Sequence, residues 1–106
     1  MKRGEIWTLQ DRSYASKARP VIIIQNDNCN SFDSVILCLL TSFDSSDVST
    51  RVPITACREN GLVKNSYVMT DKIVTVRKNM LGEFIGVLSE EDMSRVSEQL
   101  RMILDI

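Results

Sequence analysis

The sequence predicts a mainly β (α+β) fold, in which a small barrel carries a C-terminal helix. Two observations indicate this fold. Short β-branched or alternating segments follow one another up to residue 88, and the apolar spacing then changes to a helical period. The chain has 106 residues, a usual length for one domain, and we expect a single domain over residues 1–106.

The first three strands are predicted from local composition, over residues 4–9, 19–25 and 34–41. In the first strand the side chains alternate between the two faces, so that Ile6 and Trp7 lie on opposite faces. The second contains four consecutive β-branched residues, 21–24, and the third is continuously apolar. Such runs favour burial on both faces of a sheet, or a closed barrel. A polar loop, residues 10–18, separates the first two strands.

The remaining β segments are predicted over residues 51–55, 66–70, 73–76 and 83–88, with a single helical turn over 77–80. Pro53 lies in the first of these segments and lacks an amide hydrogen. A proline is tolerated in a sheet only at an edge or a bulge. We therefore expect the segment around Pro53 to be irregular or to lie at a sheet edge.

A C-terminal helix is predicted to begin after Ser89, because Ser89 and Asp92 have the spacing of a capping box. Acidic residues follow Ser89 directly and complement the helix dipole. The apolar positions have helical spacing and are expected to pack on the sheet: Met93, Val96, Leu100, Ile103 and Leu104.

Composition excludes several classes of protein and of catalytic site. With 43% hydrophobic and 25% charged residues, the chain has the composition of an ordinary globular protein. No apolar run approaches the ~20 residues of a membrane span, and the N-terminus becomes polar at Thr8. We expect a cytoplasmic protein without membrane association. The lack of CxxC pairs and the apolar context of Cys38 predict that this residue is a small buried hydrophobe.

The chain contains no histidine. This excludes Ser-His and Cys-His nucleophiles, histidine-bound zinc and RNA cleavage by paired histidines. The four glycines are isolated, so that no phosphate-binding or dinucleotide-binding loop is present. We expect neither a metal nor a cofactor, and any catalysis must use carboxylates, Arg or Lys, hydroxyls or amides.

Arg19 is the first candidate functional residue, because it directly precedes the buried strand at residues 21–24. An arginine cannot enter a core without a partner. Taken alone, Arg19 is most simply a solvated charge at a strand end, and Thr41 is a β-former that ends a strand. Only a pairing of the two would indicate chemistry.

Short motifs extend along the whole chain in a fixed order. They are RGEIW at 3–7, RPVIIIQND at 19–27, LTS at 40–42, TRVPI at 50–54, Gly61-Leu62 with Ser66, DKI at 71–73 with Thr75-Val76, and IGVLS at 85–89. In this order they resemble the MazF/PemK family of toxin endoribonucleases from type II toxin–antitoxin modules. Each motif alone is weak, and the order and spacing carry the resemblance.

The resemblance implies an SH3-like antiparallel barrel of the plasmid-maintenance-toxin type, which forms a homodimer. It implies metal-independent, sequence-specific cleavage of single-stranded RNA, often mRNA, and inhibition by a cognate antitoxin. The family pattern assigns the catalytic pair to Arg19 and Thr41. We expect the RNA contacts at Ser42, Lys17, Ser16, Gln25, Asn26 and Arg77.

The implied chemistry fits a chain without histidine. The 2′-oxygen of RNA attacks the adjacent phosphorus, and negative charge builds on the phosphoryl oxygens. A planar guanidinium such as that of Arg19 can donate to two of these oxygens, and Thr41 can donate to the same phosphate.

An alternative is a non-catalytic binding module on the same fold, either a degenerate toxin or a gyrase-poisoning relative. The motivation is Val74, which stands where many family members carry a basic residue, although Arg77 or Lys78 are candidates to supply the charge. A second motivation is the loop before Arg19, where some family members carry a carboxylate and this chain offers only Asp11. The gyrase-poisoning group acts through C-terminal aromatic residues, whereas this chain ends in Met102-Ile103-Leu104-Asp105-Ile106.

Overall fold

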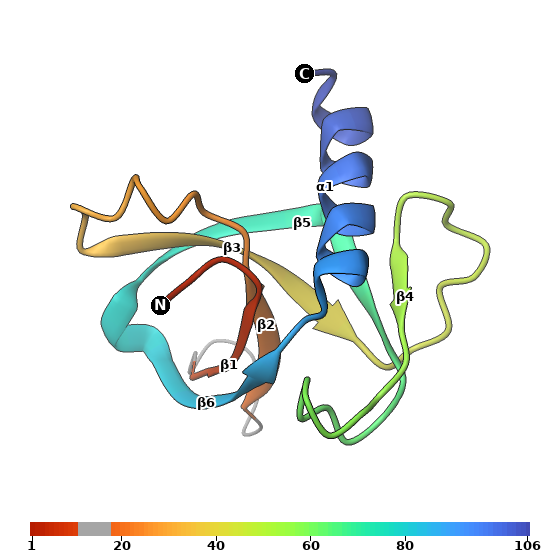
Figure 1. Cartoon of the computed structure of the whole chain (residues 1–106), viewed down its shortest axis with the longest axis horizontal. Helices are drawn as coiled ribbons and strands as arrows, with labels where there is room; N and C mark the ends of the chain where they lie inside the picture. Colours follow the sequence, from red (N-terminus) through yellow and green to blue (C-terminus); the bar gives the residue numbers. More distant parts are fainter. Residues whose placement is uncertain (11–17) are drawn as a thin grey trace.

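The computed structural model describes residues 1–10 and 18–106, which form a six-stranded antiparallel sheet and one C-terminal α-helix (Figure 1). The strands are β1 Glu5–Leu9, β2 Arg19–Ile23, β3 Ser34–Thr41, β4 Val52–Ile54, β5 Ser66–Arg77 and β6 Leu81–Val87. Their order in the sheet is β4-β5-β3-β2-β1-β6. The predicted mainly β fold is confirmed. The sheet is curled but not closed, since β4 and β6 are its two edges in the described part of the chain.

The central strand β2 is buried on both faces, as its continuous apolar run predicts, and so is most of β3, although Ile36 is 39% exposed. Ile22, Cys38 and Leu40 belong to one core cluster, which also contains Val96 and Leu100 of the helix. Successive side chains of a strand point to opposite faces, so the residues between these in β2 and β3 belong to a second cluster. The buried members of that cluster are Leu9, Val21, Ile23, Val35, Leu37 and Leu81. Cys38 is fully buried, which confirms its predicted role as a small hydrophobe.

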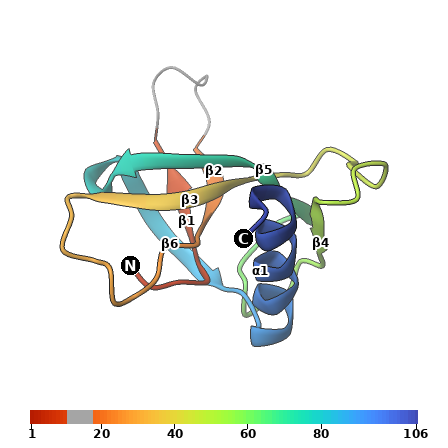
Figure 2. The ribbon, with the colours of Figure 1, turned by 90° about the horizontal axis from the view of Figure 1, so that it is seen from above.

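The predicted segments 66–70 and 73–76 are one continuous strand, β5, which bends in the middle (Figures 1 and 2). Cys38 pairs with Ile73, whereas the next residue of β3, Leu39, pairs with Met69. Residues 70–72 are therefore inserted relative to β3 and form a bulge, and bulges bend the strand that carries them. The predicted helical turn follows as a 3-10 turn, η1 Lys78–Met80.

The sheet edge and the helix pack against each other. Pro53 lies in the edge strand β4, as its missing amide hydrogen predicts, and Arg95 of the helix donates to its carbonyl oxygen at 3.0 Å. The helix, α1 Glu90–Leu104, is capped by Ser89, whose Oγ accepts from the amide of Asp92 at 3.1 Å.

The last turn of α1 extends beyond the sheet (Figure 1). Val96 and Leu100 are buried, but Ile103 and Leu104 are 41% and 51% exposed. The expectation that these two residues pack on the sheet was wrong, because the helix continues after its last contact with the sheet. No helix in the described ranges is both long enough and apolar enough to span a membrane.

Candidate active site

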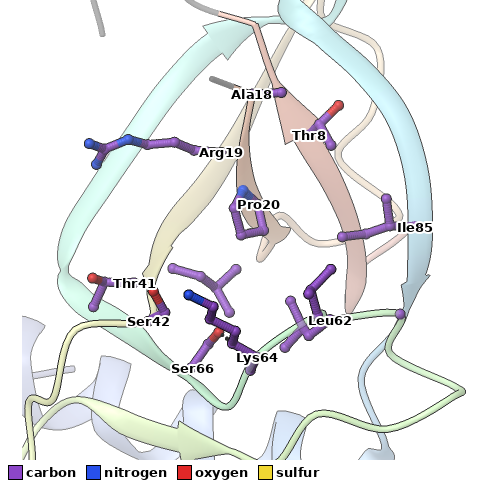
Figure 3. Close-up of a pocket in the computed structure, with 13 residues that line it drawn as sticks. Thr8, Ala18, Arg19, Pro20, Thr41, Ser42, Leu62, Lys64, Ser66 and Ile85 are labelled. Atoms are coloured by element: carbon purple, nitrogen blue, oxygen red, sulfur yellow. Dashed lines mark hydrogen bonds between the residues drawn. The ribbon is translucent and has the colours of Figure 1, made fainter. Parts of the chain in front are cut away.

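One open pocket of about 700 Å³ lies where β2 begins and β3 ends. Five parts of the chain line it: β1, the start of β2, the end of β3 with the residue after it, the β4–β5 loop with the first residue of β5, and β6 (Figure 3). The lining residues are Thr8, Ala18, Arg19, Pro20, Leu40, Thr41, Ser42, Gly61, Leu62, Val63, Lys64, Ser66 and Ile85. Three of the residues predicted from the sequence, Arg19, Thr41 and Ser42, are therefore brought together.

The strand register explains why Arg19 and Thr41 meet. Val21 pairs with Leu39 in the antiparallel ladder of β2 and β3. Each step back along β2 is a step forward along β3, so the same register places Arg19 opposite Thr41. Both side chains lie on one side of the pocket, with Leu62 and Ile85 on the other (Figure 3).

Arg19 presents an exposed guanidinium at the rim of a rigid strand. Its backbone pairs with Leu9 of β1, and the ring of Pro20 fixes the next φ angle. Neither of the two ion pairs between described residues, Arg51–Asp71 and Arg95–Asp92, involves Arg19. No described carboxylate therefore neutralises its charge, which leaves the guanidinium able to bind an anion.

Thr41 is oriented by the turn that follows it. Its Oγ1 accepts a hydrogen bond from the amide of Phe43 at 3.1 Å. Because a threonine hydroxyl has one hydrogen to donate as well as lone pairs to accept with, Thr41 can still donate to a ligand in the pocket. Ser42, exposed and next in sequence, adds a second hydroxyl at the same place.

The loop between β3 and β4 is fixed by Arg51, which donates to both carboxylate oxygens of Asp71 at 3.0 Å. Arg51 also donates to Ser45 at 3.1 Å. The Arg51 guanidinium holds the pKa of Asp71 below its usual value, and Asp71 raises the pKa of Arg51. Arg51 therefore has a structural role, which is to hold this loop.

Three predicted RNA contacts lie away from the pocket. Gln25 is buried and holds the β2–β3 loop, since its Nε2 donates to the carbonyl of Cys29 at 2.5 Å and its Oε1 accepts from the amide of Ile36 at 3.1 Å. Asn26 is exposed and caps a turn through the amide of Asn28 at 2.8 Å.

Arg77 pairs with Ser34, at the end of β3 that is remote from Thr41. Seven residue steps of extended strand separate Ser34 from Thr41, a distance of roughly 20 Å. Two further predicted contacts, Ser16 and Lys17, lie outside the described residues together with Asp11. Val74 is partly buried and packs against the second core cluster.

The β4–β5 loop supplies lining residues that the sequence did not single out, above all Lys64. The available signal was a charged residue shortly after an Asn-Gly turn, but only the fold places that turn beside Arg19. In the described ranges, no group of three or more Cys, Asp or Glu residues could hold a metal ion.

Comparisons with known proteins show the family of this chain. A family model for the PemK-like, MazF-like toxin of type II toxin-antitoxin systems matches residues 2–104. The chain is 36% identical to a probable endoribonuclease MazF of Mycolicibacterium smegmatis, over 100% of this chain and 98% of the relative. It is 32% identical to the endoribonuclease EndoA of Bacillus subtilis, over 98% and 94% of the two chains.

Solved structures show the same fold. The Mycobacterium tuberculosis toxin MazF-mt6 superposes with a TM-score of 0.81 at 26% identity, covering 96% of this chain and 97% of that one. A mycobacterial endoribonuclease in complex with its cognate antitoxin superposes with a TM-score of 0.86 at 25% identity, covering 100% and 96%. The predicted resemblance is thus confirmed, and the chain belongs to the PemK-like, MazF-like toxins of type II toxin–antitoxin systems.

Proposed function

We propose that this protein is a metal-independent endoribonuclease toxin, which cleaves single-stranded RNA in the pocket with Arg19 and Thr41 as the catalytic pair. The family, and relatives at 32% and 36% identity that are named endoribonucleases, support the enzyme class. The register that places Arg19 opposite Thr41 is the observation that supports this site.

The described lining of the pocket suits a polyanion. It contains two cations, Arg19 and Lys64, and no carboxylate. Its four side-chain hydroxyls are those of Thr8, Thr41, Ser42 and Ser66, of which that of Ser66 already donates to the carbonyl of Lys64. Positive charge in a concave site attracts a negatively charged substrate and raises its local concentration. A phosphodiester of RNA therefore fits this lining better than a neutral or cationic ligand does.

The proposed reaction uses the RNA's own 2′-hydroxyl as nucleophile. The 2′-oxygen forms a bond to phosphorus as it loses its proton, and the bond from phosphorus to the 5′-oxygen breaks. The leaving oxygen takes up a proton, so that the products are a 2′,3′-cyclic phosphate and a 5′-hydroxyl. Arg19 donates to two phosphoryl oxygens as charge develops, and Thr41 donates to the same group.

Pre-oriented donors of this kind are the usual source of transition-state stabilisation when charge develops on oxygen. Loss of one such donor commonly reduces the rate by about 10²–10³-fold. The backbone of Arg19 is fixed by its strand, and the hydroxyl of Thr41 by the Phe43 amide, so little reorganisation is required of either residue.

We also propose that the toxin works in the cytoplasm as a homodimer and is neutralised by a cognate antitoxin. Two observations support the antitoxin: the family is that of type II toxin–antitoxin systems, and a mycobacterial relative of the same fold was solved in complex with its cognate antitoxin. Single-stranded mRNA, the proposed substrate, is abundant in the cytoplasm.

The test is to incubate purified protein with a long RNA in the presence of EDTA and to determine the end groups of the fragments. We expect cleavage at a short sequence, with a 5′-hydroxyl on each downstream fragment. A requirement for a divalent cation, or fragments with 5′-phosphates, would contradict the proposed reaction. Intact RNA would instead favour the alternative of a non-catalytic module.

A further inference from the structure

Lys64 is the second cation that lines the pocket, and it belongs to a different wall from Arg19. It lies in the β4–β5 loop, is exposed, and its side chain points into the pocket (Figure 3). We propose that Lys64 binds an RNA phosphate next to the scissile one and so positions the substrate. This inference rests on the proposed function and adds a specific contact to it.

The loop that carries Lys64 is seated directly on β6. A Cβ atom added to Gly61, whose φ is +68°, would lie 1.9 Å from the carbonyl oxygen of Ile85. A Cβ added to Gly86 would lie 2.4 Å from the carbonyl oxygen of Asn60. The amide of Val87 donates to the carbonyl of Glu59 at 2.9 Å. Loop and strand thus touch through backbone atoms, which is possible only with glycine at both points.

Hydrogen bonds inside the loop fix it further. Asn60 is 2% exposed, accepts from the amides of Cys57 and Leu62 at 3.1 and 3.0 Å, and donates to the carbonyl of Thr55 at 2.9 Å. Asn65 accepts from the amide of Ala56 at 2.8 Å, which closes the loop at its base.

The backbone of Lys64 itself is held, because its carbonyl accepts from the hydroxyl of Ser66 at 2.9 Å. Binding therefore has to order only the side chain of Lys64, and not the loop that carries it. Pre-organisation of this kind reduces the entropic cost of binding.

Two other cations proposed from the sequence, Arg77 and Lys78, lie in the described part of the chain but do not line the pocket. Arg77 lies at the remote end of β3, and Lys78 donates through Nζ to the carbonyl of Asn30 at 3.2 Å. Val74 is uncharged, and it is partly buried against the second core cluster. Lys64 supplies a positive charge to the pocket from a different element.

The two cations suit different phosphates. The forked guanidinium of Arg19 matches two oxygens of one phosphoryl group, whereas an ammonium is a point charge with three rotatable donors on a flexible stem. A point charge can hold a neighbouring phosphate without a strict geometry. We therefore expect Lys64 to act mainly on substrate binding and Arg19 on the chemical step.

The experiment compares three variants with the native protein: Lys64→Gln, the conservative Lys64→Arg, and Lys72→Gln. Lys72 is an exposed lysine of β5 that does not line the pocket, and its substitution changes the net charge equally. Binding is measured by fluorescence anisotropy with a single-stranded RNA that is methylated at its 2′-oxygens and cannot be cleaved. The salt concentration is varied from about 50 to 200 mM.

For Lys64→Gln we expect affinity to fall by about fivefold, and the slope of log K against log salt to become shallower by about 0.7, the value for one phosphate contact on a single strand. Lys64→Arg should retain the native slope, and so should Lys72→Gln. In cleavage assays with unmethylated RNA, Lys64→Gln should raise KM and leave kcat within about twofold.

If Lys64→Gln keeps the slope and affinity of Lys72→Gln, the Lys64 proposal is overturned. Native protein that binds the methylated RNA but never cleaves the unmethylated one overturns the proposed reaction, and the slope comparison still decides the role of Lys64. Native protein that binds no RNA at all overturns both proposals.

Discussion

Gly86 of β6 and Asn60 of the β4–β5 loop contact each other through backbone atoms. A Cβ on Gly86 would lie 2.3 Å from the carbonyl carbon of Asn60 and 2.4 Å from its oxygen, closer than real Cβ contacts. The position of one pocket wall is therefore set by the strand on which it rests. Leu62 and Lys64 belong to this wall, so its seating affects the proposed RNA site.

Substitution of Gly86 by alanine should force the β4–β5 loop away from β6. We expect a loss of about 1–3 kcal/mol in the free energy of unfolding, the usual cost of overpacking, measured by urea denaturation. Gly82→Ala on the same strand is the comparison, because its Cβ would meet side-chain atoms, Oγ1 of Thr8 at 2.6 Å and Nε2 of Gln10 at 3.0 Å, and no backbone atom of the loop. Equal losses for the two variants would show that the contact with Asn60 is not special.

Acid should destabilise the loop between β3 and β4 through Asp71. The hydrogen bonds from Arg51 hold the pKa of Asp71 below the usual value of an aspartate, so the folded state favours the ionised form. This stabilisation is present above the unfolded pKa and is lost as the pH falls through the lower, folded pKa.

In urea denaturation at falling pH, the Asp71→Asn variant should lack this part of the acid destabilisation. Because the ion pair is partly exposed, the native protein should lose only about 1 kcal/mol or less more unfolding free energy on acidification than Asp71→Asn does. Glu98→Gln, on the exposed face of α1, is the control. A pH profile of Asp71→Asn that is parallel to the native one would argue against the ion pair.

Thiol reagents should distinguish Cys38 from the other cysteines. Cys38 is fully buried, and burial raises the pKa of its thiol to about 12, whereas Cys29 and Cys57 are exposed. Only the thiolate reacts readily. A colorimetric thiol assay at about pH 8 should therefore count two reactive thiols in native protein and three in denaturant. Rapid reaction of all three in native protein would be inconsistent with this core.

The hydroxyl of Thr41 should contribute more to the rate of RNA cleavage than its methyl group does. We expect Thr41→Ser to keep kcat within severalfold and the near-isosteric Thr41→Val to lower it by about 10²-fold, because only valine lacks the proposed phosphate donor. Valine also removes the acceptor of the Phe43 amide, so thermal melts must accompany the kinetics. Similar kcat values for the serine and valine variants would exclude Thr41 as a donor.

Much of the fold could be predicted from local patterns, because the responsible interactions are local or periodic. The run at 21–24 predicted burial on both faces, Pro53 an edge, and Ser89 a helix cap, and all three are confirmed. The continuity of β5 was missed, because the polar pair Asp71-Lys72 reads as a break and the bulge is defined only by pairing with β3. The exposed end of α1 was also missed, since helical spacing does not reveal where the sheet ends.

The candidate site was predictable only where neighbouring strands carry it. Arg19, Thr41 and Ser42 come together because β2 and β3 are hydrogen-bonded neighbours. Gln25 and Arg77 have suitable chemistry for RNA, but register and burial direct them elsewhere, and no single segment contains that information. Lys64 reaches the pocket through contacts between a loop and β6, which are distant in sequence.

The most direct test of the account is the single-turnover rate of RNA cleavage by the Arg19→Ala variant, measured in EDTA at saturating protein. Arg101→Ala removes an exposed arginine of α1 and is the matched control. We predict that Arg19→Ala is slower than the native protein by at least about 10²-fold, while Arg101→Ala cleaves at the native rate. An Arg19→Ala variant that cleaves within severalfold of the native rate would contradict the assignment of catalysis to this pocket.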